Sequence, residues 1–169
     1  LKAIRNIIDD LSKSTKNISF EFFGSSIAEY QSTISDMDLE KYVFFYGQVT
    51  YETALELMEH ASCLILIDAN SDIGNVFVAS KLVDYWYFND KPILAITPKN
   101  SSSNILLSNC NAPTFEHDEI EKISDFILEV VHGKNKKMLK RTCGEKLFTL
   151  SDAVYRLSQI LITKNCDGD

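Results

Sequence analysis

Residues 76–98 read VFVASKLVDYWYFNDKPILAITP, and their pattern decides the fold. A helical pattern begins at Ser80, and a Lys-Pro pair then leads into the wholly apolar run 93–96. A strand without polar residues is typical of a parallel sheet that helices cover on both faces. The stretch therefore predicts a helix followed by a strand of such a sheet.

The alternation of helix and strand continues on both sides of this stretch. Strands are predicted at 18–22, 43–46, 63–67, 93–96 and 114–115, and helices at 1–14, 51–61, 80–88, 102–108, 118–131, 136–148 and 150–162. Strands that are separated by helices indicate an open parallel sheet. We therefore expect an α/β protein with a Rossmann-like open parallel sheet and helices on both faces.

The helix over 51–61 has a clear beginning and a clear apolar side. Thr50 is a good N-cap residue, because its side-chain oxygen can accept a free backbone N–H of the first turn. Four apolar residues share one side of the helix and are expected to be buried: Ala54, Leu55, Met58 and Ala61.

Composition excludes several classes of protein. The chain has 169 residues, of which 45% are hydrophobic and 24% charged, as in an ordinary globular domain. No apolar run approaches the roughly 20 residues that a membrane span needs. Residues 1–15 do not have the pattern of a signal peptide, and the start at Leu1 suggests a trimmed segment. The net charge of −7 disfavours nucleic acid as a partner.

The basic run over 134–141 and the cysteines and histidines give weaker signals. The basic run is expected to be a solvated loop and helix start, with a phosphate or an anionic membrane surface as the alternative. The cysteines and histidines are Cys63, Cys110, Cys143, Cys166, His60, His117 and His132. Their spacing matches no metal site, and it favours reduced thiols in a cytoplasmic protein. We therefore expect neither a metal nor a cofactor.

Three loops follow predicted strands, where open α/β sheets bind their ligands. They cover 24–26, 47–50 and 68–79. The last loop leads into a helix, and free N–H groups at such a place suit a diphosphate. Ser80 can add a hydroxyl donor and Lys81 a positive charge. Asp84 lies one turn, about 5.4 Å, beyond Ser80, where its carboxylate could accept both hydroxyls of a ribose.

Residue types alone leave other interpretations open. Ser80 could cap the helix while Lys81 pairs with Asp84, and nothing would bind. A Ser-Lys nucleophile and base is disfavoured because no glycine elbow accompanies the pair. Tyr85 and Tyr87 could stack on a base, whereas packing in the core is the expected role of Trp86.

The order of motifs resembles the C-terminal, donor-binding domain of GT-B glycosyltransferases, above all the large retaining family 4 group. Its members have an apolar strand followed by Gly and Val, a helix, a second apolar strand and, after a variable loop, SKLFEYLAAGKPVLA. The counterparts here are VFFYGQV at 43–49, YETALELMEHASCLILI at 51–67 and SKLVDYWYFNDKPILA at 80–95. The last of these is the specific part of the match.

The resemblance implies roles for particular residues. Asp84 would hold the donor ribose. The donor diphosphate would lie against Ser80 and the backbone of Gly74, Asn75 and Val76, and the nucleobase pocket would be lined by Gly47, Gln48 and Val49. The resemblance implies no catalytic residue on this half of the enzyme. Residues 1–148 would form the donor domain, and 149–169 would hold the helix that crosses back and a tail.

The chain also departs from the family pattern. Val76 stands where the first of two glutamates is usual, and Asp90 stands where a glycine is usual before the Lys-Pro. The chain begins at the first helix of the family domain. Compared with the family pattern, we therefore expect this sequence to lack the strand and basic loop before that helix and the N-terminal acceptor domain.

The resemblance implies the donor half of a glycosyltransferase that moves a sugar from a nucleoside diphosphate to a polysaccharide or glycolipid acceptor. Its partners would be a nucleotide sugar and the missing acceptor domain, and the parent would be cytoplasmic, at the inner face of the membrane. An exposed strand edge would favour a homodimer of the fragment. Two alternatives stay open: a flavodoxin-like protein-interaction module without nucleotide, and a GT-B nucleotide-sugar epimerase.

Overall fold

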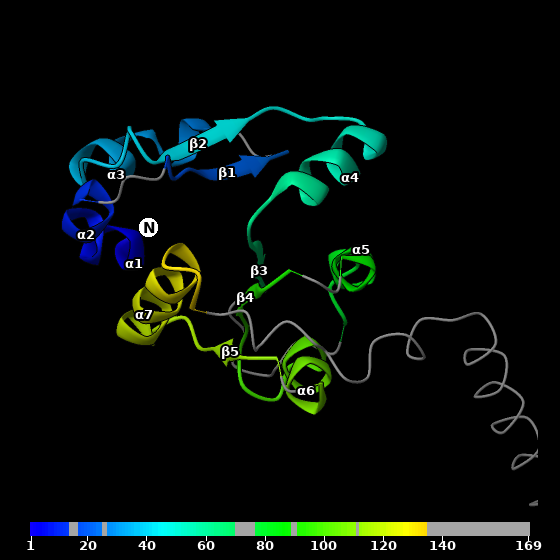
Figure 1. Cartoon of the computed structure of the whole chain (residues 1–169). Coiled ribbons are helices and arrows are strands. Elements are labelled where there is room, and N and C mark those ends of the chain that lie inside the picture. Colours follow the sequence, from blue (N-terminus) through cyan, green and yellow to red (C-terminus); the bar gives the residue numbers. More distant parts are fainter. Residues whose placement is uncertain (14–16, 25–26, 70–76, 89–90, 111, 135–169) are drawn as a thin grey trace, which may run out of the picture.

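The structure, a computed structural model, describes residues 1–13, 17–24, 27–69, 77–88, 91–110 and 112–134 (Figure 1). Its elements are α1 (Lys2–Asn6), α2 (Ile8–Lys13), β1 (Phe20–Phe23), η1 (Ile27–Glu29), α3 (Gln31–Asp36), β2 (Val43–Tyr46), α4 (Tyr51–His60), β3 (Leu64–Ile67), α5 (Lys81–Tyr87), β4 (Ile93–Ile96), α6 (Ser102–Asn109), β5 (Thr114–Phe115) and α7 (Ile120–Val131). The helices predicted at 136–148 and 150–162 lie outside the described residues. Of the helices that are described, none combines the length and apolar character of a membrane span.

All strand pairs in the described chain are parallel, which confirms the predicted α/β class. β1 pairs with β2, with Phe20 opposite Val43. β4 lies between β3 and β5, with Leu64 opposite Ile93 and Ala95 opposite Thr114. The described strands form two sheets, β1–β2 and β3–β4–β5, and Figure 1 shows the first above the second.

Helices cover both faces of the three-stranded sheet. Because side chains alternate along a strand, neighbouring residues of β4 enter different cores. Ile93 and Ala95 belong to the core that contains Leu82 of α5 and Leu107 of α6. Leu94 belongs to the core that contains residues of α1 and α7. This arrangement confirms the prediction of a sheet with helices on both faces.

The core beneath α1 and α7 also joins the two sheets. It contains Phe20 of β1 and Val43 of β2 together with Leu94 of β4. The buried Ser124 hydroxyl of α7 lies 3.0 Å from the carbonyl oxygen of Ala3 in α1, within hydrogen-bond distance. The first and last described helices therefore share a buried hydrogen bond in addition to their apolar contact in this core.

Several predictions about single elements need correction. The helix predicted at 1–14 is divided into α1 and α2, because the backbone leaves helical geometry at Ile7. η1 and α3 were not predicted, since the segment around them has no regular apolar stripe. Thr50 caps α4 as expected and accepts the Thr53 N–H at 3.2 Å.

The prediction for the apolar side of α4 overestimates its burial. Ala54, Leu55, Met58 and Ala61 are only partly buried, and α4 has no buried residue. The reason is their place at the margin of a core: Leu55, Met58 and Ala61 pack against the core that contains Leu82, but they do not enter it.

The two described cysteines differ in state. Cys63 is a free thiol, and burial raises its pKa to about 11. Cys110 is buried and disulfide-bonded. The expectation of reduced thiols is therefore confirmed for Cys63 and wrong for Cys110.

Candidate functional site

The candidate site lies where the parallel strands end and the chain turns toward the following helices. The turns after β1 and β2 begin side by side, because the Gly24 N–H donates to the Gly47 carbonyl oxygen at 3.1 Å. Gly24 has a φ of +91°, a conformation that favours glycine. The loop after β2 then carries Gly47, Gln48 and Val49, all exposed, into the beginning of α4.

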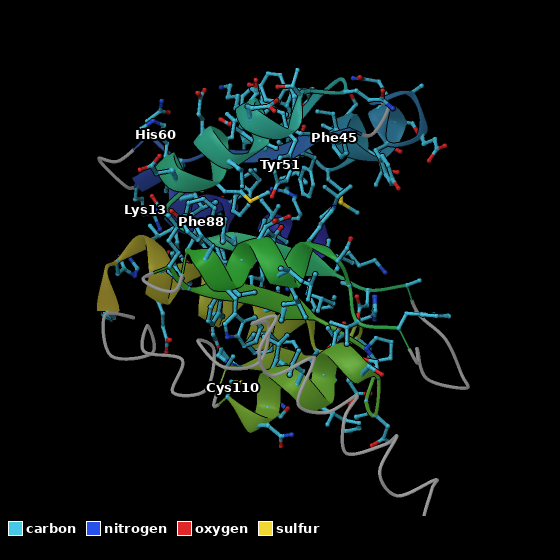
Figure 2. The ribbon with its side chains drawn as sticks, turned by 90° about the vertical axis from the view of Figure 1, so that its right-hand side faces the viewer. Lys13, Phe45, Tyr51, His60, Phe88 and Cys110 are labelled. Atoms are coloured by element: carbon cyan, nitrogen blue, oxygen red, sulfur yellow. The ribbon has the colours of Figure 1, made fainter. Side chains whose placement is uncertain are left out.

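A hydrogen bond joins the beginning of α4 to the first turn of α5. The Tyr51 hydroxyl donates to Asp84 Oδ1 at 2.8 Å, across 33 positions of sequence. Figure 2 labels Tyr51 on α4. The hydrogen bond to the carboxylate raises the pKa of Tyr51, because it stabilises the protonated phenol. The loop over 47–49, predicted to line the nucleobase, leads into α4, and Asp84, predicted to hold the ribose, lies in the first turn of α5. The bond from Tyr51 connects these two helix starts.

The interpretation in which Ser80 caps α5 and Lys81 pairs with Asp84 is wrong for this structure. Ser80 has helical backbone angles, φ −55° and ψ −34°, and its side chain makes no capping hydrogen bond. A capping side chain needs an extended backbone at this position. In the described chain Lys81 has no ion pair, and Asp84 is bonded to Tyr51.

Ser80 and Lys81 stand exposed at the start of α5, one turn before Asp84. Their hydroxyl and ammonium groups can therefore donate to a ligand that also reaches the Asp84 carboxylate. The other residues predicted for the diphosphate, Gly74, Asn75 and Val76, lie outside the described residues.

The aromatic residues of α5 have separate roles. Trp86 is buried in the core, as predicted. Tyr85 is buried as well, and its hydroxyl donates to the Ile65 carbonyl oxygen at 2.8 Å. Tyr87 is 82% exposed. Tyr85 therefore fixes α5 to β3, and of the three only Tyr87 presents its ring to solvent.

Asp68 is a residue at the sheet edge that the sequence analysis placed in a loop without giving it a role. It directly follows β3, its N–H donates to the Ile96 carbonyl oxygen at 3.0 Å, and its own carbonyl oxygen lies 2.9 Å from His117 Nε2. Asp68 is 5% exposed, and within the described chain its Oδ2 has no hydrogen-bond partner. Its position immediately after an apolar strand was the signal that could have singled it out.

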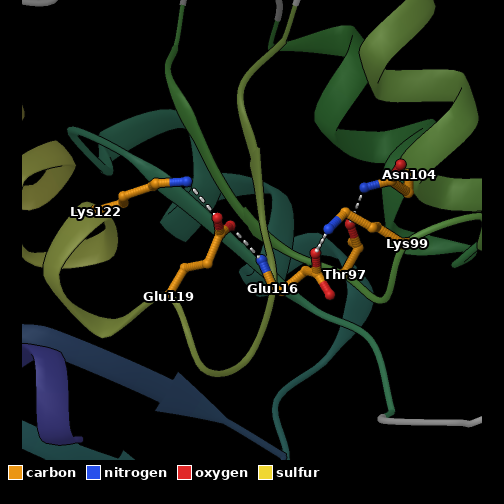
Figure 3. A network of polar contacts seen from close by, with 6 residues as sticks. All are labelled: Thr97, Lys99, Asn104, Glu116, Glu119 and Lys122. Carbon is orange, nitrogen blue, oxygen red and sulfur yellow. Dashed lines mark hydrogen bonds and ion pairs between the residues drawn. The ribbon is translucent and has the colours of Figure 1, made fainter.

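Polar groups beyond β4 and β5 mostly satisfy one another (Figure 3). The buried Thr97 Oγ1 accepts from Asn104 Nδ2 at 3.1 Å. Lys99 pairs with Glu116, and this hydrogen bond raises the pKa of Lys99. Glu119 pairs with Lys122, and the hydrogen bond lowers the pKa of Glu119. These contacts fix the loops around β5 and leave the strand ends near α4 and α5 as the candidate site.

No metal centre is indicated in the part of the chain that the structure describes, where no cluster of three or more His, Cys, Asp or Glu residues forms. Comparison with known proteins adds no family: no protein-family model matches the chain, and no curated protein matches it significantly. The resemblance to GT-B glycosyltransferases therefore stays a prediction.

Proposed function

We propose that this chain binds a nucleotide sugar at the starts of α4 and α5 and is the donor half of a glycosyltransferase. The observation that supports the proposal best is the 2.8 Å contact between Tyr51 and Asp84. It connects the helix that directly follows the loop over 47–49 to the Asp84 carboxylate. Both helices follow parallel strands, whose C-terminal ends are the usual place for nucleotides in such folds.

Each exposed group of the site suits one part of such a ligand. The Asp84 carboxylate accepts hydrogen bonds from the ribose hydroxyls. The Ser80 hydroxyl and the Lys81 ammonium donate to the diphosphate and stabilise its charge as it leaves the sugar. The site needs a second domain to bring an acceptor and a base, so we propose that the chain alone transfers no sugar.

The remaining parts of the proposal concern partners and place. The acceptor domain would belong to the same longer protein, which acts at a membrane on polysaccharide or glycolipid acceptors. Each described sheet leaves its two outer strands with one unpaired edge, which supports a homodimer of this chain.

A protein-interaction module is the second candidate, and exposed apolar side chains near β2 favour it. Phe44 and Tyr46 share one face of β2 and are 37% and 43% exposed. An isolated exposed side chain is ordinary, but neighbouring ones on one face are typical of a contact surface. A GT-B nucleotide-sugar epimerase would bind the same donor and is separated from a transferase only by its product.

Calorimetric titration of the chain with UDP, GDP and ADP tests the proposal. We expect one of the three to bind, and Asp84→Asn to weaken that binding at least tenfold, because a neutral amide accepts the ribose hydroxyls less strongly. Asp125→Asn is the matched control, since Asp125 is exposed on α7, away from the site. No heat with any nucleotide would favour the interaction module and reject the proposal.

A further inference from the structure

Neither packing in the core nor the start of α4 explains why a tyrosine stands at position 51. Its side chain is 60% exposed, so it does not serve the core. Thr50 already caps the helix by accepting the Thr53 N–H. A tyrosine at this position is therefore not explained by packing or by the helix start. Among the described residues, the polar contact of its side chain is with Asp84.

We propose that Tyr51 is a positioning residue of the nucleotide site, which orients the Asp84 carboxylate toward the ribose and presents its ring to the nucleobase. This inference rests on the proposed function. It adds a residue to which the resemblance assigns no role, and it makes the preference for a ribose over a 2′-deoxyribose depend on α4.

The hydrogen bond from Tyr51 fixes the orientation of the Asp84 carboxylate. In the described chain the Asp84 carboxylate has the Tyr51 hydroxyl as its one hydrogen-bond partner, and the contact uses Oδ1. An ionised carboxylate has about four acceptor positions, so a single donor leaves Oδ2 fully available to a hydroxyl. Without the tyrosine hydroxyl, Asp84 would be a half-exposed side chain free to change rotamer.

The ring of Tyr51 lies where the other end of a nucleoside belongs. The base is attached directly to the ribose, so a ligand held by Asp84 places its base within a few ångströms of that acid. Tyr51 stands at the first position of α4, directly after the loop over 47–49 and Thr50, and reaches Asp84 with its hydroxyl. An exposed aromatic ring in that position offers the flat apolar surface on which bases stack.

Electrostatics supports the same assignment. The hydroxyl must be protonated to donate, and the contact with Asp84 raises the pKa of Tyr51. Tyr51 therefore stays neutral through the physiological range and adds no negative charge beside a ligand that is itself anionic.

The test compares UDP, GDP and ADP with their 2′-deoxy forms, by calorimetry on the full chain. Wild type should prefer the ribose form. Tyr51→Phe keeps the ring and removes the hydroxyl, so it should weaken the ribose form about fivefold and leave the 2′-deoxy form nearly unchanged. Tyr51→Leu should weaken both forms, because the ring is also lost. Tyr87→Phe, which removes the hydroxyl of the exposed tyrosine on α5, is the matched control and should change neither.

A double variant separates positioning from a merely structural tether. Tyr51→Phe combined with Asp84→Asn should bind no more weakly than Asp84→Asn alone, because both changes act on one contact. If Tyr51→Phe keeps the wild-type preference for ribose while Asp84→Asn loses it, the proposed function stands and the role of Tyr51 is rejected. If wild type binds none of the nucleotides, both are rejected.

Discussion

Asp84 is held from outside its own helix, by a tyrosine at the start of α4. The sequence predicts that Ser80, Lys81 and Asp84 share one side of a helix, because helical spacing alone fixes that relation. It does not predict the bond from Tyr51, which depends on how two helices 33 positions apart come to lie together. Side chains that meet through tertiary packing are the part of a site that a single sequence hides.

The Tyr51–Asp84 bond has a pH signature. The pKa of Tyr51 is raised above its ordinary 10.0 by Asp84, so the protonated phenol is the stabilised form. Its contribution to stability is complete below about pH 10 and is lost as the pH rises through the raised pKa. In a spectrophotometric titration of tyrosinate, Asp84→Asn should shift one phenol to lower pH. Identical titration curves for the two proteins would show that the bond does not form in solution.

Cys63 should react slowly with thiol reagents. Burial raises its pKa to about 11, so only about one molecule in a thousand carries a thiolate at pH 8. We expect alkylation of Cys63, followed by peptide mass spectrometry, to be at least about a hundredfold slower in the folded chain than in denaturant. Equal rates in both conditions would contradict the partly buried position of the thiol.

At the scale of elements, wholly apolar runs were the most predictable. β2 and β4 have the predicted bounds, because neither strand contains a polar residue and each ends next to a glycine or a short polar turn. α3 was missed because a single buried residue, Ile34, fixes it to the core, and one residue gives no periodic pattern. The burial of α4 was overestimated because its amphipathic pattern does not tell how much of the apolar side is covered.

α5 is fixed to the core by the buried side chain of Leu82, and the contribution of this side chain to stability can be measured. Leu82 is fully buried in the core, whereas Val83, its neighbour on the same helix, is 48% exposed. Leu82→Ala should lower the free energy of unfolding by about 2–5 kcal/mol through the cavity it leaves. Val83→Ala should change the free energy of unfolding by no more than about 0.5 kcal/mol. Urea denaturation of both variants provides the comparison, and equal losses would mean that α5 is packed differently.

At the scale of the whole molecule, the described strands form two parallel sheets that share one core. The sequence predicts the parallel class from the apolar strands and their helical connections. It does not predict the division into two sheets, because strand order and pairing are set by contacts between distant segments. This division determines which strand edges are unpaired, and the proposed homodimer depends on those edges.

Self-association through the β1–β2 sheet is expected at high protein concentration. Phe44 lies on β2, is 37% exposed and borders an edge without a strand partner in the described chain. Phe44→Lys should abolish a dimer in sedimentation velocity, because a charge beside a strand edge opposes pairing. Ile105→Lys, at a 51% exposed position of α6, is the control. A wild-type chain that stays monomeric at all concentrations would contradict this part of the proposal.

The most direct test of a nucleotide site at the starts of α4 and α5 is a set of amide nitrogen–proton NMR spectra recorded during titration with UDP, GDP and ADP. We predict that at least one of the three shifts the amides of residues 47–51 and 80–84, while those of α7 over 120–131 keep their positions. Spectra in which no nucleotide moves the first two segments, or in which only α7 responds, would contradict a donor site at this edge of the fold.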